Sequence, residues 1–332
     1  MSTIAVIGAG SWGTAISIAL ARNGHTVRLT TRNPKHVEAL RLDRENKRYL
    51  PGIPLDPRII IAENDEEAIP GADLTVFAAP AQHFREALES AAPFLESGDR
   101  IVNVSKGIEL GTLLRMSEIA HILRRDLIFT ALSGPSHAEE VCRALPTTLV
   151  AASENVEAAK YVQDIFMSDR LRVYTSDDVT GVEIGGALKN IIALGAGISD
   201  GIGFGANAKA ALMTRGITEM SRLGTALGAK AETFAGLTGV GDLIVTCTSL
   251  HSRNLRCGIL IGQGVPPEKA VEKVGMVVEG FYTTDAAYTL ARRKNVEMPI
   301  TSSIYRCLHG EVGPEEAVRQ LMMRPAKPEE TV

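Results

Sequence analysis

The chain has 332 residues, of which 45% are hydrophobic and 22% charged, and this composition is typical of a globular protein with about two domains. The net charge of -4, without clusters of Lys and Arg, argues against a nucleic-acid-binding protein. Lys189 interrupts the longest apolar run before it reaches the roughly 20 residues of a membrane span, and no basic region precedes an apolar stretch at the N-terminus. The four cysteines and seven histidines form no zinc, redox or metal-ligating pattern, so we expect reduced thiols, a cytoplasmic protein and no metal site.

A glycine-rich turn follows the first predicted strand. Residues 3–7 are β-branched and apolar, and they run directly into Gly8-Ala9-Gly10-Ser11-Trp12-Gly13 and then into a helical pattern. In this fingerprint the first glycine allows a tight turn, the second lets the backbone approach a pyrophosphate, and the third lets the helix pack against the strand. Its position between a strand and a helix favours a dinucleotide-binding site over a plain glycine-rich turn.

The residue type after the second strand indicates which dinucleotide binds. This strand is predicted at residues 26–30, and an NAD-selective enzyme usually carries Asp or Glu just beyond it to bind the ribose 2′-hydroxyl. Neither is present, and Arg32 stands where a guanidinium can clamp a 2′-phosphate. We therefore predict NADPH/NADP as the cofactor, or use of both NADP(H) and NAD(H). A surface arginine that only caps the turn is the alternative.

Strands and helices alternate through the first half of the chain. Further strands are predicted at residues 58–62, 74–78, 101–104, 127–132, 147–151 and 171–174, with helices between most of them. This alternation predicts an α/β domain over residues 1–180 with a doubly wound, mostly parallel sheet of the Rossmann type. After residue 178 only helical patterns follow, so we predict an all-helical second domain over residues 181–332.

Ligands of such a sheet bind beyond the carboxyl ends of its strands. Strand direction places Ser11, Trp12, Arg32, Lys106, Gly134 and Ser136 at this edge. Lys106 can hold an oxyanion or a phosphate there, or it can be a solvated loop lysine. Ser136 can be the N-cap of the helix that follows, and capping is compatible with ligand binding.

One cation lies in the middle of the long apolar helix predicted at residues 181–203. The neighbours of Lys189 three and four positions away are small or apolar, so no carboxylate of its own helix supports the charge. A lysine that is desolvated in this way has a lowered pKa and can give and take a proton near neutrality. The alternative is a lysine whose stem is buried and whose head reaches water.

Two polar clusters mark helix starts in the second domain. Asp242 follows Gly239-Val240-Gly241, where capping alone explains an acid. Ser252, Arg253 and Asn254 combine a hydroxyl, a guanidinium and an amide, and this set suits an anion such as a phosphate ester. An N-cap followed by a surface arginine is the alternative.

Together, these motifs resemble those of the bacterial-type NAD(P)-dependent sn-glycerol-3-phosphate dehydrogenases, nearly from end to end. The resemblance rests on residues 8–15, 105–109, 134–138, 188–190, 239–243, 252–254 and 278–280. His137 and Val240 depart from the family pattern without changing a charged group. The resemblance implies an oxidoreductase, in the form of a homodimer, that interconverts dihydroxyacetone phosphate and sn-glycerol 3-phosphate and supplies the latter for phospholipid biosynthesis.

The resemblance also implies a role for individual residues. Lys189 would be the general acid that protonates the ketone oxygen, and the base in the reverse direction. Lys106 would bind both substrate and cofactor. The substrate pocket would further include Gly134, Ser136, Asp242, Ser252, Arg253 and Asn254. The dinucleotide would contact Gly8, Gly10, Ser11, Trp12, Gly13, Arg32, Tyr49, Ala138, Arg253, Val277 and Glu279.

Two other functions remain open from the sequence. One is another two-domain ketoacid or hydroxyacid reductase, such as a ketopantoate reductase, although the residues 252–254 suit a phosphate better than a second carboxylate. The other is a non-catalytic dinucleotide sensor, in which Lys189 would be structural.

Overall fold

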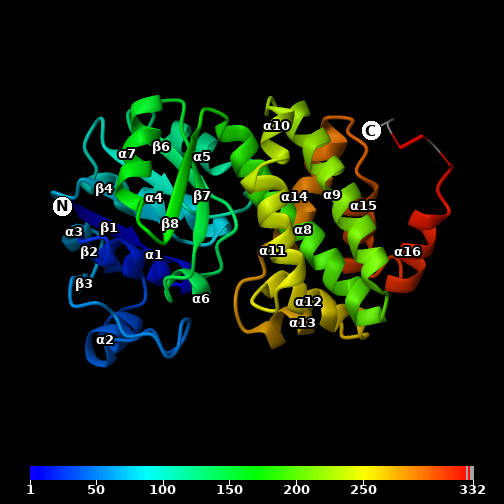
Figure 1. Ribbon diagram of the computed structural model, residues 1–332, viewed down its shortest axis with the longest axis horizontal. Helices are drawn as coiled ribbons and strands as arrows, with labels where there is room; N and C mark the ends of the chain where they lie inside the picture. Colours follow the sequence, from blue (N-terminus) through cyan, green and yellow to red (C-terminus); the bar gives the residue numbers. More distant parts are fainter. Residues whose placement is uncertain (327, 330–332) are drawn as a thin grey trace. The chain divides into compact units, whose positions relative to one another are not determined.

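The computed structural model describes residues 1–326 and 328–329, and the chain divides into two compact units (Figure 1). The first unit consists of Met1–Ser105 and Met116–Val179, and the second of Lys106–Arg115 and the chain from Thr180 onward. The single boundary predicted at residue 180 leaves Lys106–Arg115 in the first domain. This segment belongs instead to the helical unit, because Ile108 is part of that unit's buried core and Arg115 pairs with Glu183 at 2.8 Å.

One eight-stranded sheet forms the centre of the first unit, in the order β3-β2-β1-β4-β5-β6-β7-β8 (Figure 1). The strands are β1 (Thr3–Ile7), β2 (Thr26–Thr30), β3 (Ile59–Ile61), β4 (Leu74–Phe77), β5 (Arg100–Asn103), β6 (Ile128–Ser133), β7 (Thr147–Ala152) and β8 (Leu171–Ser176). Neighbouring strands pair in parallel except β6 and β7, which are antiparallel. The predicted doubly wound, mostly parallel sheet is confirmed.

Helices of the first unit, apart from α2, contact one another in two groups. The helices of this unit are α1 (Ser11–Arg22), α2 (Pro34–Asp43), α3 (Asp65–Ala68), η1 (Ala81–His83), α4 (Phe84–Ala91), η2 (Ala92–Phe94), α5 (Met116–Leu123), α6 (Ala138–Val141) and α7 (Val156–Phe166). Helix α1 contacts α6 and α7, whereas α4 contacts α3 and α5. The short helices α3 and α6 span one turn each, which is too little for a periodic pattern in the sequence.

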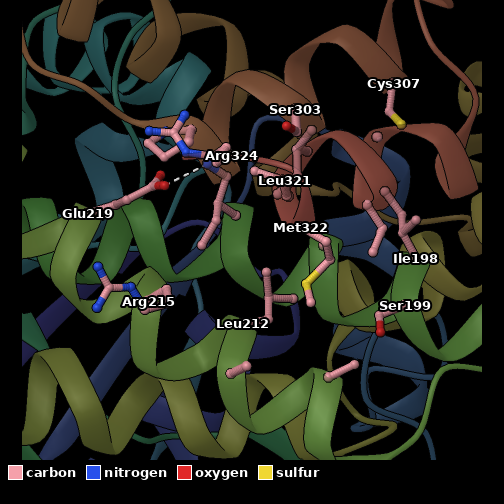
Figure 2. Close-up of a pocket in the computed structure, with 18 of the residues that line it drawn as sticks. Ile198, Ser199, Leu212, Arg215, Glu219, Ser303, Cys307, Leu321, Met322 and Arg324 are labelled. Carbon is pink, nitrogen blue, oxygen red and sulfur yellow. Dashed lines mark hydrogen bonds between the residues drawn. The ribbon is translucent and has the colours of Figure 1, made fainter. Parts of the chain in front are cut away.

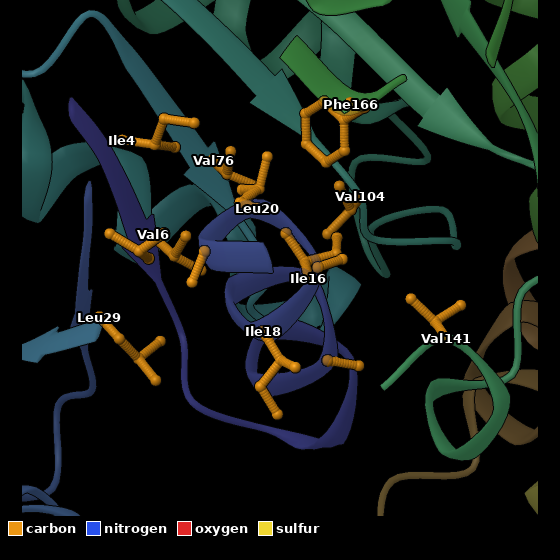
Figure 3. Close-up of a cluster of buried hydrophobic side chains, with 14 of the residues drawn as sticks. Ile4, Val6, Ile16, Ile18, Leu20, Leu29, Val76, Val104, Val141 and Phe166 are labelled. Carbon is orange, nitrogen blue, oxygen red and sulfur yellow. The ribbon is translucent and has the colours of Figure 1, made fainter. Parts of the chain in front are cut away.

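Aliphatic side chains of α1 pack against those of the neighbouring strands in one buried cluster (Figure 3). Val6 of β1, Leu29 of β2 and Val76 of β4 are fully buried, as is Leu20 of α1. Burying such side chains stabilises a fold by roughly 1.5–3 kcal/mol each. The cluster therefore fixes the positions at which β1, β2 and β4 end, and those ends carry the glycine turn and Arg32.

The second unit consists of helices. They are α8 (Val179–Ile202), α9 (Ala206–Ala226), α10 (Ala231–Phe234), the π-helical turn η3 (Leu237–Gly241), α11 (Asp242–Thr248), α12 (Arg253–Gly262), α13 (Pro267–Val274), α14 (Glu279–Arg293), α15 (Pro299–Leu308) and α16 (Pro314–Met322). Helix α8 is long and apolar enough to cross a membrane, but 94% of its most apolar window is buried in the protein. Such burial is typical of a core helix, and the other helices of the unit supply its partners.

Candidate active site

The glycine turn of the first unit is closed on one side and open on the other. A Cβ atom at Gly13 would lie 1.9 Å from the carbonyl oxygen of Gly8, so no side chain fits between α1 and β1. A Cβ atom at Gly10 would meet no atom of the described residues within 4 Å. Helix α1 begins at Ser11, and within the described part of the chain no side chain caps its N-terminus. Close packing behind an open, uncapped helix start fits the binding of a dinucleotide pyrophosphate.

Two further residues of the predicted cofactor site lie beside this turn. The indole Nε1 of Trp12 is buried and has no hydrogen-bond partner among the described residues, which indicates a partner from a ligand or from water. Asn46 donates to the carbonyl oxygen of Ala9 at 2.9 Å and to Thr14 Oγ1 at 2.7 Å. Because the backbone N–H of Tyr49 in turn donates to Asn46 Oδ1, the loop that carries Tyr49 is tied to the glycine turn.

Arg32 lies two residues beyond β2, where the sequence predicts it. Its Nη1 donates to Glu86 Oε2 at 2.6 Å, and His83 Nδ1 lies 3.1 Å from the same oxygen. An acid is therefore present beside the end of β2, but it comes from α4. Local patterns in the sequence do not indicate this acid, because the strand order that brings β2 and β4 to the two sides of β1 cannot be read from them.

The loop after β6 differs from the prediction at Ser136. The N-cap of α6 is His137, which makes no side-chain cap bond, so the prediction that Ser136 caps this helix is wrong. The Ser136 hydroxyl donates instead to the carbonyl oxygen of Gly134 at 2.8 Å and closes the turn there. Gly134 has a φ of +132°, and Ala138, the first residue of α6, is buried.

In the second unit, one carboxylate joins two lysines. Asp242 Oδ1 accepts a hydrogen bond from Lys189 Nζ at 2.5 Å, and Asp242 Oδ2 accepts one from Lys106 Nζ at 2.7 Å. Lys189 Nζ also donates to Thr246 Oγ1 at 2.8 Å. The side chain of Lys189 is 8% exposed and that of Asp242 is 1% exposed, so the alternative of a lysine whose head reaches water does not apply. Asp242 is the first residue of α11, directly after the π-helical turn. Its carboxylate accepts hydrogen bonds from both lysines.

Burial and charge set the protonation of this cluster. Burial lowers the pKa of Lys189 to about 8; the nearby Lys106 acts in the same direction and Asp242 opposes it. Burial by itself would raise the pKa of Asp242, but the two ammonium groups outweigh it and hold this pKa below its usual value. Asp242 is therefore an anion at neutral pH, while Lys189 releases its proton more readily than an exposed lysine.

A chain of amide contacts holds α8, α12 and α14 together beside Lys189. Asn254 Nδ2 donates to Asn190 Oδ1 at 2.9 Å, and Asn254 Oδ1 accepts from the backbone N–H of Gly280 at 2.8 Å. A Cβ atom at Gly280 would lie 2.5 Å from the carbonyl oxygen of Asn190, so only glycine allows this approach. The motif at residues 278–280 thus positions the start of α14. Glu279, the first residue of this helix, and Val277 just before it are half-buried.

Ser252 and Arg253 lie at the start of α12. Ser252 Oγ accepts from the backbone N–H of Leu255 at 3.2 Å, so Ser252 is an N-cap, as one of the two interpretations expects. Arg253 is the first residue of the helix and is half-buried. The sequence motifs assign no role to Asn190, although it lies within the motif at residues 188–190, and they do not include Thr246. The position of Thr246, four residues after Asp242 on the same helix, is the signal that could have indicated it.

A cavity of about 380 Å³ lies elsewhere in the second unit, between α8, α9, α15 and α16 (Figure 2). Its lining is mostly apolar, with Leu212, Leu321 and Met322 among its side chains. Neither Lys189 nor Asp242 lines it. It is therefore distinct from the lysine and carboxylate cluster, which has the polar groups that a phosphorylated substrate needs.

Taken together, the fold and the two sites define a dehydrogenase of the Rossmann class, with a dinucleotide-binding unit and a helical unit that carries a buried lysine. Residues 3–159 match the family model for the N-terminus of NAD-dependent glycerol-3-phosphate dehydrogenase, and residues 178–319 match the model for its C-terminus. The chain belongs to this glycerol-3-phosphate dehydrogenase family, and the resemblance inferred from the motifs is confirmed.

Individual relatives agree with this assignment. The chain is 51% identical to the glycerol-3-phosphate dehydrogenase (NAD(P)+) of Bacillus velezensis over 98% of its own length and 95% of the relative. It is also similar to the crystal structure of glycerol-3-phosphate dehydrogenase from Coxiella burnetii, with a TM-score of 0.94 and 39% identity over 97% of this chain and 99% of that one. A ketopantoate reductase from Ralstonia eutropha has a TM-score of 0.61 at 17% identity over 95% of this chain and 99% of that one, so the likeness to it is one of fold alone.

Proposed function

We propose that this chain reduces dihydroxyacetone phosphate reversibly to sn-glycerol 3-phosphate with NADPH or NADH, and that Lys189 is its general acid. The observation that carries the proposal is the buried Lys189 ammonium, which Asp242 and Thr246 hold and whose pKa is lowered to about 8. A general acid works best when its pKa lies near the working pH. Membership of the family supports the choice of substrate and of cofactor.

The proton transfer follows from the hydrogen bonds of Lys189. An ammonium group has three N–H donors, and Lys189 uses two of them on Asp242 Oδ1 and Thr246 Oγ1 within the described part of the chain. The third can donate to the ketone oxygen of the substrate. A nicotinamide cofactor, when bound, would supply the hydride for the carbonyl carbon. As negative charge develops on the ketone oxygen, Lys189 Nζ gives it a proton; in the reverse direction the neutral Lys189 amine takes the hydroxyl proton.

Asp242 and Lys106 set the position and the charge of the group that transfers the proton. Asp242 fixes the Lys189 amine by a direct hydrogen bond, and it balances part of the positive charge that Lys106 and Lys189 bring into a buried site. The two ammonium groups favour an anionic substrate and would stabilise the developing oxyanion.

The phosphate of the substrate requires a further group of donors. We assign it to Arg253 and to the N-terminus of α12, a helix of ten residues, because a guanidinium and a helix start both favour a phosphate dianion. Ser252, Asn254, Gly134 and Ser136 would complete the substrate site. Gly8, Gly10, Ser11, Trp12, Gly13, Arg32, Tyr49, Lys106, Ala138, Val277 and Glu279 would hold the cofactor, as the family resemblance implies.

We also infer a cytoplasmic homodimer that supplies sn-glycerol 3-phosphate for phospholipid biosynthesis. The family resemblance supports this inference, and the cysteines support its cytoplasmic part. All four, Cys142, Cys247, Cys257 and Cys307, are free and buried, which suits a reducing compartment.

Purified protein, assayed for NADPH oxidation with dihydroxyacetone phosphate and with ketopantoate, tests the proposed reaction. We expect turnover with the phosphorylated substrate only, and turnover with ketopantoate alone would contradict the assignment.

Lys189→Ala should lower kcat by about 100-fold or more while NADPH still binds. Lys269→Ala, an exposed lysine of α13, is the matched control. A Lys189→Ala variant with near wild-type turnover would exclude the general-acid role.

A further inference from the structure

The Arg32–Glu86 ion pair lies where the adenosine end of a dinucleotide binds in this fold class. Strands β2 and β4 flank β1, so the loops after all three strands share one edge of the sheet. The loop after β4 packs closely on the glycine turn, because a Cβ atom at Gly8 would lie 2.9 Å from the carbonyl carbon of Ala78. Helices η1 and α4 come directly after this loop. They contain His83 and Glu86, and Glu86 contacts both Arg32 and His83.

We propose that Glu86 determines the cofactor selectivity of this chain. Its carboxylate takes the place of the acid that is missing after β2 and accepts a hydrogen bond from the ribose 2′-hydroxyl of NAD(H). With NADP(H), the same carboxylate competes with the 2′-phosphate for Arg32. The proposal rests on the proposed function, since it requires the dinucleotide to bind at the glycine turn.

The charges at this position act in opposite directions on the two cofactors. Arg32 attracts a 2′-phosphate, whereas Glu86 repels it. Hydrogen bonds from Arg32 and His83 hold the pKa of Glu86 below its usual value, so Glu86 is an anion at neutral pH. The combined effect is a site that accepts both dinucleotides, whereas Arg32 alone would select NADP(H).

The ion pair is also easily exchanged for a ligand contact. The side chains of Arg32 and Glu86 are 54% and 58% exposed, and exposed ion pairs contribute little to stability. A phosphate can therefore displace the Glu86 carboxylate from Arg32, and a 2′-hydroxyl can join the pair without breaking it. The competing explanation is a plain surface ion pair in the first turn of α4, where an acid is favoured by the helix dipole.

Dissociation constants, measured without turnover, separate these explanations. NADPH and NADH are titrated into wild type, Glu86→Gln and Glu89→Gln, and binding is followed by calorimetry or by the fluorescence of the bound nucleotide. Glu89 is an exposed acid on the same helix and provides the matched control. We expect Glu86→Gln to bind NADPH about five- to tenfold more tightly and NADH severalfold more weakly, while Glu89→Gln binds both like wild type.

The outcomes are distinguishable. If wild type binds both nucleotides but Glu86→Gln leaves the ratio of the two dissociation constants unchanged, the role of Glu86 is refuted and the proposed function stands. If wild type binds neither nucleotide, the proposed function itself fails. Arg32→Gln supplies the complementary measurement, because it should weaken NADPH by about tenfold or more and NADH far less. Equal weakening of both nucleotides would exclude a contact between Arg32 and the 2′-phosphate, and with it the competition that Glu86 is proposed to exert.

Discussion

Asp242 on α11 and Lys189 on α8 form a buried ion pair, with Asp242 Oδ1 2.5 Å from Lys189 Nζ. The second oxygen of the same carboxylate binds Lys106, so the two lysines are coupled through one anion. Burying charges is costly, and a fold keeps them where they are paired. Removal of the Asp242 charge would take from both ammonium groups the carboxylate to which they are hydrogen-bonded.

Asp242→Asn should therefore affect both stability and activity. The amide keeps the shape of the carboxylate but not its charge, and breaking a buried pair in this way typically costs about 3–5 kcal/mol. We expect the free energy of unfolding, measured by urea denaturation, to fall by about 3 kcal/mol and kcat to fall by about 100-fold. Asp285→Asn, which removes an acid from the exposed pair with His309, should change stability by less than about 1 kcal/mol. Equal stability of Asp242→Asn and wild type would contradict the buried pair.

Lys189 also predicts the pH dependence of the reaction in each direction. Ketone reduction requires the protonated amine, and the pKa of Lys189 is about 8, so kcat/KM for reduction should fall as the pH rises through about 8. Oxidation of the alcohol requires the neutral amine and should rise over the same interval. Because Asp242 raises the pKa of Lys189, both transitions should move to lower pH in Asp242→Asn. Profiles of kcat/KM that stay flat between about pH 7 and 9 in both directions would exclude Lys189 as the titrating group.

Gly13 and Gly10 offer a test of the two sides of the glycine turn. A Cβ atom at Gly13 would lie 1.9 Å from the Gly8 carbonyl oxygen, so Gly13→Ala must push α1 away from β1 and should cost about 1–3 kcal/mol or more. A Cβ atom at Gly10 meets no atom within 4 Å among residues 1–326 and 328–329, so Gly10→Ala should fold with near wild-type stability. Both variants should bind NADPH at least about tenfold more weakly, the first through displacement of the turn and the second through contact with the pyrophosphate. Wild-type affinity in Gly10→Ala would show that the open side does not face the nucleotide.

Local patterns in the sequence predict the strands of the sheet and the apolar surroundings of Lys189 on its helix, but they do not predict the side chains that Lys189 and Arg32 contact. The strands were predicted because each is a short apolar run bounded by turns, and Lys189 stood out as a lone cation in an apolar helix. Glu86 was missed because it reaches Arg32 only through the strand order, and 54 residues separate the two in the chain. The return of Lys106–Arg115 to the helical unit was missed for the same reason, since no change in composition marks it.

Glu219 on α9 predicts how stability depends on pH. Its carboxylate accepts from the backbone N–H groups of Ile300 at 2.6 Å and Thr301 at 3.1 Å, at the start of α15. Burial raises the pKa of Glu219 from 4.5 to about 7, although these hydrogen bonds oppose the shift. Because the folded chain holds this proton more tightly than the unfolded chain does, the free energy of unfolding should fall as the pH rises from about 4.5 to about 7 and then level off.

Glu219→Gln isolates this contribution, since glutamine keeps one oxygen acceptor and cannot ionise. We measure the free energy of unfolding by urea denaturation at pH 5, 6, 7 and 8. Relative to wild type, the free energy of unfolding of the variant should rise by about 2–3 kcal/mol over this interval, at about 1.4 kcal/mol for each unit of pKa. Glu268→Gln, at an exposed acid of α13, should follow wild type at every pH. Curves for wild type and Glu219→Gln that run parallel from pH 5 to pH 8 would show that Glu219 is already ionised at the lower pH, and that the N–H donors at the start of α15 outweigh its burial.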